Sequence, residues 1–174
     1  MNIDYTFKVI VAGDEQVGKT TLLKRFVEGK FSATTKMTIG VDILRKNVEL
    51  DNGELCALQL WDFGGQDQFR FFQDGFVRGS NAAFMMFDLT RPNTLLSLEK
   101  EWIKIVRKFN KEIPLLLIGT KYDLQQLISI KDQTVLRVKK KFGMIDYIKT
   151  SSKTGFNVEK TFEIITNHLL KQLF

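Results

Sequence analysis

Short apolar runs alternate with amphipathic stretches along the chain. Four of the runs are apolar or β-branched and stop at polar residues or glycine, which predicts buried strands. They occupy residues 7–12, 82–87, 114–118 and 144–148. Two more runs, at 39–50 and 55–61, predict a strand pair. The residues between them, Asp51-Asn52-Gly53, indicate a hairpin because Asn-Gly tolerates positive φ.

Helices are predicted where apolar residues recur at helical spacing. These stretches cover residues 18–28, 94–109, 131–142 and 158–173. Strands that alternate with helices predict an α/β fold, a mostly parallel six-stranded sheet with one antiparallel edge strand and about five flanking helices. The length of 174 residues suits one domain over residues 1–174. Ligands of such sheets bind beyond the carboxyl ends of the strands.

Composition and charge exclude several classes of protein. Hydrophobic residues make up 44% and charged residues 26%, as in an ordinary globular domain, and no apolar stretch reaches the ~18 residues of a membrane span. The single cysteine, Cys56, fits a reducing, cytoplasmic compartment. The net charge of +6 lies largely in helical stretches such as 139–141, without interleaved aromatic residues, so we expect no nucleic-acid partner.

The first polar motif follows the first strand. Gly13-Asp14-Glu15-Gln16-Val17-Gly18-Lys19-Thr20 matches G-x-x-x-x-G-K-[ST] between a strand and a helix. Backbone N–H groups of such a loop converge on phosphates, and the helix N-terminus adds its positive dipole end. Lys19 can reach the β and γ phosphates, and the Thr20 hydroxyl can ligate Mg²⁺. The loop predicts a nucleoside triphosphate but does not identify the base.

Two further motifs suit a metal ion and the γ phosphate. Asp62 ends a strand beside the phosphate loop and suits a metal-site carboxylate. Gly65 can bring its N–H close to a γ phosphate, and Gln66 can orient an attacking water. Thr38 can offer its hydroxyl to Mg²⁺, although a β-branched residue can equally start a strand there. Asp62-Phe63-Gly64 also spells a protein-kinase triplet, but the chain has no H-R-D loop.

The remaining motifs suit recognition of a base. Asp123 in Thr120-Lys121-Tyr122-Asp123 can accept from N1–H and the 2-amino group of guanine, and it would repel adenine. Lys121 can lay its stem along the ring. Thr150-Ser151-Ser152-Lys153 can donate backbone N–H groups to guanine O6, or it is an ordinary loop and helix cap. Phe31 can cover the other face of the base or make a core contact.

Together these five motifs resemble the Ras superfamily of small GTPases, in order and in spacing, over about residues 7–173. Thr38-Ile39-Gly40-Val41-Asp42 and Trp61-Asp62 look Rab-like, Thr120 in place of the usual Asn looks Rho-like, and Gly64-Gly65 is similar to Arf and Gα proteins. The resemblance implies a P-loop G domain that binds GTP or GDP with Mg²⁺. It also implies exchange factors, activating proteins and effectors that bind switch I (about 32–41) and switch II (63–79).

The resemblance also assigns roles to single residues. It implies that Gln66 and Lys19 are catalytic and that Thr20, Thr38 and Asp62 bind Mg²⁺. The phosphate contacts are expected from Gly13, Glu15, Gln16, Val17, Gly18, Lys19, Thr20, Thr21, Thr38, Asp62 and Gly65. The guanine contacts are expected from Phe31, Thr120, Lys121, Asp123, Leu124, Ser151, Ser152 and Lys153.

Some positions depart from the family pattern. Glu15 stands where many relatives have glycine, and its carboxylate predicts slow intrinsic hydrolysis by repulsion and crowding near the γ phosphate. Switch I has Ala33 and Thr35 without the tyrosine often found there, and Phe63 is bulkier than usual. The last residues contain no cysteine and Asn2 follows Met1, so we expect no lipid anchor in the chain as written; contact with a membrane surface stays open.

The predicted function is a GTP/GDP switch that hydrolyses GTP to GDP and phosphate. Arg70 and Arg78 lie in or near switch II, but neither is identified as an arginine finger, so an external activating protein is expected. One alternative is a pseudo-GTPase that holds GTP with little turnover, suggested by Glu15. A second alternative is a P-loop ATPase or nucleotide kinase, but Asp123 argues against adenine nucleotides. A third is a nucleic-acid binder, suggested by the net charge.

Overall fold

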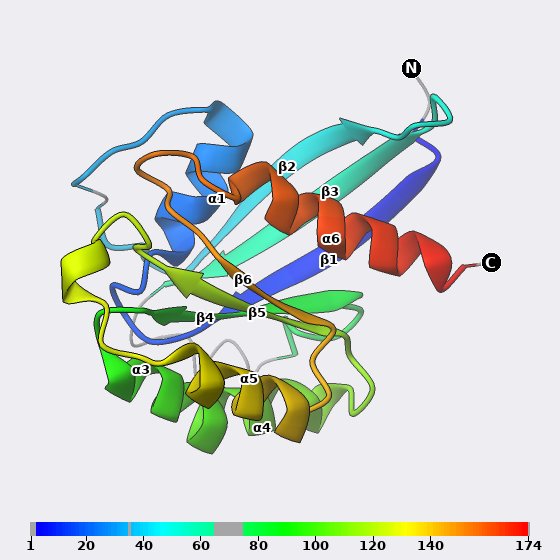
Figure 1. Ribbon diagram of the computed structural model, residues 1–174. Helices are drawn as coiled ribbons and strands as arrows, with labels where there is room; N and C mark the ends of the chain where they lie inside the picture. Colours follow the sequence, from blue (N-terminus) through cyan, green and yellow to red (C-terminus); the bar gives the residue numbers. More distant parts are fainter. Residues whose placement is uncertain (1–2, 35, 65–74, 174) are drawn as a thin grey trace.

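A computed structural model describes residues 3–34, 36–64 and 75–173 of the chain. Six strands form one sheet in the order β2-β3-β1-β4-β5-β6 (Figure 1). Their bounds are β1 Tyr5–Ala12, β2 Val41–Glu49, β3 Leu55–Phe63, β4 Ala82–Asp88, β5 Leu115–Thr120 and β6 Asp146–Lys149. Only β2 runs antiparallel to its neighbour, β3, through the predicted hairpin. The predicted sheet is therefore confirmed.

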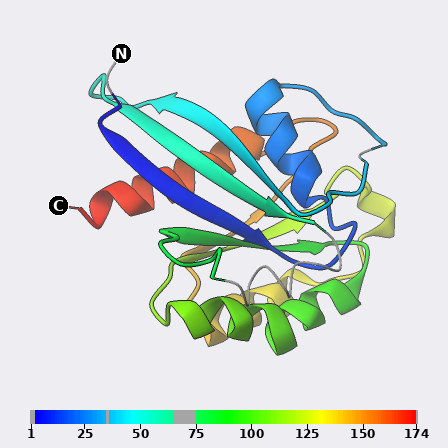
Figure 2. The same ribbon diagram turned by 180° about the vertical axis from the view of Figure 1, so that it is seen from behind.

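Helices cover both faces of this sheet (Figures 1 and 2). The two on one face are α1 (Lys19–Glu28) and α6 (Val158–Lys171), whose apolar side chains pack on the sheet with Phe84 and Leu116. The other face carries α3 (Pro92–Ser97), a π-helical turn η2 (Leu98–Trp102), α4 (Ile103–Phe109) and α5 (Asp132–Lys141). A short 3₁₀ turn, η3 (Gln125–Leu127), follows β5.

The central strands have the composition that burial on both faces requires. All seven residues of β4 and all six of β5 are buried, and their sequences are almost entirely apolar up to the last residue. Asp88 and Thr120 end these two strands side by side in the register of the sheet. The core thus holds polar residues at the carboxyl edge, where a site was expected.

Close packing of the backbone fixes the loops at this edge. Gly13 has φ of 151°, and a Cβ atom there would lie 2.3 Å from the carbonyl oxygen of Met86 in β4. Two residues other than glycine also have positive φ at this edge, Gln16 at 61° and Lys121 at 62°. Such conformations are costly and cluster at functional sites, where the surrounding structure holds them.

In the part of the chain that the structure describes, no helix is both long enough and apolar enough to span a lipid bilayer.

Candidate functional site

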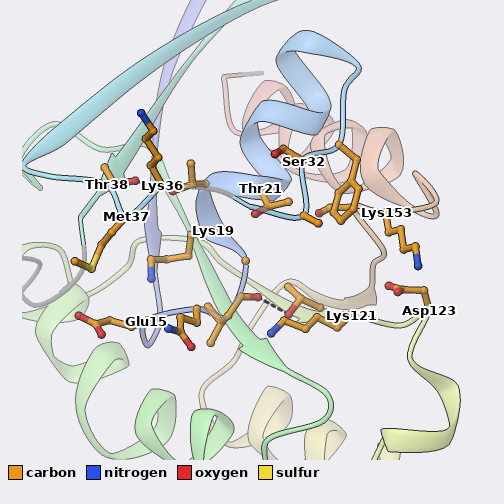
Figure 3. A pocket seen from close by; sticks show the side chains of 18 of the residues that line it. Glu15, Lys19, Thr21, Ser32, Lys36, Met37, Thr38, Lys121, Asp123 and Lys153 are labelled. Carbon is orange, nitrogen blue, oxygen red and sulfur yellow. Dashed lines mark hydrogen bonds between the residues drawn. The ribbon is translucent and has the colours of Figure 1, made fainter.

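A cavity of about 630 Å³ opens at the carboxyl edge of the sheet (Figure 3). This volume is within the range of small-molecule sites. Figure 3 shows Glu15, Lys19 and Thr38 toward one end, with Asp123 and Lys153 at the other. The wall consists of residues 15–21, 31–33, 36–38, Phe63, Thr120, Lys121, Asp123, Leu124, Ser152 and Lys153. The site prediction missed Ser32, Ala33, Lys36, Met37 and Phe63.

Lys19 brings a buried positive charge to one end of the cavity. Its side chain extends from the start of α1, and Nζ donates to the carbonyl oxygens of Gly13 at 2.9 Å and Asp14 at 2.8 Å. Only 6% of the residue is exposed. Burial lowers the pKa of Lys19 to about 8, although the carboxylates of Asp62, Asp14 and Glu15 act in the opposite direction. An anion at this end would therefore stabilise the ammonium form.

Two hydroxyls and a carboxylate meet beside Lys19. The Oγ1 atoms of Thr20 and Thr38 lie 2.8 Å apart, and both donate to Oδ2 of Asp62, Thr38 at 3.4 Å. Oδ1 of Asp62 is buried and has no hydrogen-bond partner among the described residues. Burial raises the pKa of Asp62, only partly offset by the hydroxyls of Thr20 and Thr38 and the charge of Lys19. Oxygen ligands are what a hard cation such as Mg²⁺ requires, so these residues fit that ion.

The loops after β5 and β6 meet at the opposite end. The Ser151 hydroxyl donates to Oδ1 of Asp123 at 2.7 Å, and the N–H of Tyr122 donates to the carbonyl oxygen of Thr150 at 3.0 Å. The N–H of Ser151 donates to the carbonyl oxygen of Phe156, so it is already used within the loop. Ser151 therefore orients the Asp123 carboxylate from behind, and Ser152 and Lys153 face the cavity.

Thr120 links the two ends of the cavity through hydrogen bonds. Its buried hydroxyl donates to the carbonyl oxygens of Val17 at 2.6 Å and Phe87 at 3.0 Å. The phosphate loop is thereby tied to β4 and to the start of the base-recognition motif. A threonine hydroxyl can do this without the amide of the usual asparagine, which gives a physical account of the Rho-like residue at this position.

A buried carboxylate that the sequence motifs did not reveal also links the two ends. Asp88 accepts from Lys121 Nζ at 2.7 Å, from Arg91 Nε at 3.0 Å and from both the N–H and hydroxyl of Thr90. Arg91 Nη2 also donates to the carbonyl oxygen of Glu15 at 3.1 Å. Burial raises the pKa of Asp88, but these donors outweigh burial and leave it lowered. An acidic residue directly after a buried strand was the available signal.

Helix packing adds another contact to the phosphate loop. The Trp102 indole N–H, at the end of η2, donates to Oδ1 of Asp14 at 2.8 Å. Beside Asp14, Glu15 lines the cavity, and its Oε1 is buried without a partner within the described part of the chain. The end of the cavity that holds Lys19 thus also contains a carboxylate, of which one oxygen has no hydrogen-bond donor among the described residues.

Most of the predicted nucleotide contacts line this one cavity. Gly13, Asp62 and Ser151 do not line the wall but contact residues that do, through Lys19, Thr20 and Asp123 respectively. Phe31 lines the cavity and is 38% exposed, which argues against the alternative of a core contact. Gly65 and Gln66 lie outside the described residues, as does Thr35.

With this geometry known, comparison with known proteins identifies the family. The sequence model described as "Ras: Ras family" matches residues 8–171. The chain belongs to the Ras family. It is 34% identical to Ras-related protein Rab-19 of Rattus norvegicus over 170 residues, which are 97% of this chain and 77% of that protein. It is 33% identical to Ras-related protein RABA2a of Arabidopsis thaliana over 169 residues, 97% of this chain and 76% of that protein.

A third relative gives the same result. Ras-related protein Rab-2B of Dictyostelium discoideum is 33% identical over 171 residues, 98% of this chain and 83% of that protein. This Ras family chain is therefore a Rab-like small GTPase, a GTP/GDP switch that uses Mg²⁺ and hydrolyses GTP, as the sequence motifs predicted.

Proposed function

We propose that the cavity binds guanine nucleotide with its phosphates at the Lys19 end and its base at the Asp123 end. The observation that carries this proposal is the placement of two complementary groups of residues in one cavity. Lys19, Thr20 and Thr38 offer an ammonium and two hydroxyls at one end, where phosphates and a cation need them. Asp123 offers an acceptor pair at the other, held in place by Ser151.

The residues of the chain would act in hydrolysis mainly by positioning and charge neutralisation. Lys19 neutralises charge on the β and γ phosphates, and its burial strengthens that interaction. Thr20, Thr38 and Asp62 would hold Mg²⁺, which supplies further charge neutralisation on the phosphates when bound. The role of Gln66, which is to orient the attacking water, comes from the family pattern.

Glu15 supports a low intrinsic rate of hydrolysis. Its carboxylate shares the phosphate end with Lys19, and Oε1 has no compensating donor among the described residues. Negative charge there opposes the charge that γ-phosphate transfer must accommodate. The same observation favours a second candidate, a GTP-binding module with little or no turnover. Phosphate release in a single turnover distinguishes the two, since only the module gives a flat trace over many hours.

Exposed apolar side chains support a protein-binding surface around switch I. Ile39 is 89% exposed and Met37 is 74% exposed, and Ile43 of β2 and Phe76 are also exposed. Contiguous exposed apolar surface usually marks an interaction site. Because Thr38 lies between Met37 and Ile39 and contacts the proposed cation site, we propose that effectors and regulators read the nucleotide state here.

The proposal is tested by nucleotide selectivity. Protein carrying Asp123→Ala should lose its preference for GDP over ADP by roughly 10²–10⁴-fold, because two hydrogen bonds to a charged acceptor disappear. Competition against a fluorescent GDP measures this directly. Glu112→Ala, which removes an exposed carboxylate away from the cavity, serves as the control. A wild-type protein that releases no guanine nucleotide on denaturation and does not prefer GDP to ADP would refute the assignment.

A further inference from the structure

A second cavity of about 560 Å³ lies away from the nucleotide site, between α6 and the β2–β3 hairpin. Its floor is apolar, with the Phe26 and Phe162 rings stacked face to face and Val48, Leu50 and Leu170 around them. The lining residues of α6 run from 159 to 170, which is about 16 Å at ~1.5 Å per residue. We call this cavity the hairpin groove. A segment of about five extended residues would span it.

The wall of the hairpin groove is strongly acidic. Five carboxylates line it, and no described lysine or arginine does. They belong to Glu49, Asp51, Glu54, Glu159 and Glu163. This concentration occurs in a chain whose net charge is +6, so it departs from the overall balance. Like charges gathered around an apolar floor repel one another unless a cation compensates them.

Few of these carboxylates have cationic partners within the chain. Glu163 pairs with Lys160 at 2.8 Å, but both side chains are more than half exposed, which makes the pair weak. Glu54 accepts from the Asn52 amide. Glu49, Asp51 and Glu159 form no ion pair within residues 3–34, 36–64 and 75–173. Most of the negative charge around the groove is therefore available to an external partner.

A buried polar atom in the groove independently indicates a ligand. Thr166 lines the hairpin groove on α6 and is only 2% exposed, yet its hydroxyl oxygen has no hydrogen-bond partner in the described part of the chain. A buried hydroxyl without a partner is destabilising, because it has lost its hydrogen bonds to water. A bound segment that supplies a backbone or side-chain partner would remove this cost.

We propose that the hairpin groove binds a protein segment that carries basic residues around one or two large apolar side chains. The apolar side chains would lie on the floor against Phe26 and Phe162, and the basic side chains would reach the acidic wall. This site is separate from the nucleotide cavity and goes beyond the switch function. Charge complementarity favours such a segment over a lipid surface, because anionic headgroups would be repelled by the wall.

The test uses the GDP-bound protein and a defined probe, a blocked six-residue peptide of alternating lysine and leucine. We expect its amide chemical-shift changes to fall on residues 48–54 and 159–170. The double variant Glu49→Lys/Glu159→Lys should weaken binding at least about tenfold. The matched control is Glu101→Lys/Glu112→Lys, which changes the net charge equally at exposed positions outside the groove and should leave the affinity unchanged. GDP release should be unaffected in both.

Further variants make the result decisive. Thr166→Val keeps the shape and removes the hydroxyl, so it should weaken peptide binding without lowering the unfolding temperature. A lysine–serine peptide should bind much more weakly than the lysine–leucine peptide. The proposal is overturned if the two peptides bind equally, if both charge-reversed variants lose affinity alike, or if the shifts map elsewhere. It is also overturned if the groove residues broaden with protein concentration alone, which would identify a second copy of the chain as the occupant.

Discussion

Glu15 brings a carboxylate to the end of the cavity that we assign to the phosphates. Its Oε1 lacks a partner among the described residues, while its own carbonyl oxygen is held by Arg91. The backbone at this position is therefore fixed, and the side chain cannot retreat by a simple shift of the loop. Two effects on the γ phosphate follow, namely charge repulsion and crowding.

We predict that Glu15→Gly accelerates intrinsic GTP hydrolysis by on the order of tenfold, because both effects are removed. Glu15→Gln keeps the shape and removes only the charge, so it measures the electrostatic part. The measurement is phosphate release in a single turnover with Mg²⁺ present. If Glu15→Gln is as slow as wild type while Glu15→Gly is fast, crowding is responsible. Equal rates in all three proteins would contradict any role of Glu15.

Asp88 makes folding stability depend on pH. Burial alone would raise its pKa, but donors from Lys121, Thr90 and Arg91 leave it lowered in the folded protein. The stabilisation is therefore fully present above the unfolded pKa of ~3.9 and is lost as the pH falls through the lower, folded pKa. Asp88→Asn should cost about 1–3 kcal/mol at pH 7, and the difference should shrink below about pH 4.

Denaturant unfolding of the GDP-bound protein between pH 7 and pH 3 checks this prediction. Asp146→Asn is the control, since its pair with Lys139 spans 3.2 Å between partly exposed side chains and contributes roughly 0–1 kcal/mol. A constant difference between wild type and Asp88→Asn across the whole range would show that the ionised carboxylate does not contribute as described.

At the scale of elements, the helix after β4 supports the phosphate loop at two points, one just before its first residue and one in its middle. Arg91, just before α3, holds the carbonyl oxygen of Glu15, and Trp102, at the end of η2, holds the side chain of Asp14. A π-helical turn within an α-helix is uncommon and often marks a functional position. Here it ends at the residue whose indole reaches the loop.

Loosening this support should release nucleotide faster. Trp102→Phe removes the indole donor to Asp14 and is predicted to increase the dissociation rate of a fluorescent GDP by up to about tenfold. Ile103→Val, a neighbouring buried residue on α4, is the control. It should lower stability by roughly 0.5–1.5 kcal/mol and leave the dissociation rate unchanged. If both substitutions accelerate release equally, general destabilisation explains the effect.

The elements themselves were well predicted because hydrophobic periodicity is local. The strand expected at 82–87 is β4, and the helix expected at 131–142 is α5. The helix expected at 94–109 begins two residues earlier and contains η2. The hydrophobic pattern also could not show the hydrogen bond from Trp102, because its partner Asp14 lies 88 positions away. Asp88 and Arg91 were missed because the contacts that tie them to the site, with Lys121 and with the Glu15 carbonyl oxygen, come from other loops. A sequence motif identifies residues at fixed spacing within one segment, and it does not reveal contacts between segments that are far apart in the sequence.

At the scale of the whole molecule, the start of switch II contacts switch I beside the nucleotide cavity, at the end of the sheet opposite the hairpin groove. The N–H of Gly64 donates to the carbonyl oxygen of Gly40 at 2.7 Å, and a Cβ at Gly64 would lie 1.9 Å from the Thr38 carbonyl oxygen. The backbones after β3 and before β2 therefore have to move together. Between this edge and the hairpin groove, β3 is mostly buried and pairs along its whole length with β1 and β2.

This arrangement predicts which segments change their backbone dynamics when the bound nucleotide changes. Hydrogen exchange should slow in residues 36–43 and 75–79 when a non-hydrolysable GTP analogue replaces GDP, because Thr38 then gains ligands, and it should stay constant in residues 159–170. Gly64→Ala should abolish the protection of 75–79, since the methyl group separates the two backbones. Mass spectrometry of the exchanged peptides measures both. Protection that spreads evenly to α6 would mean that the sheet transmits the change, and the hairpin groove would then be coupled to the switch instead of independent of it.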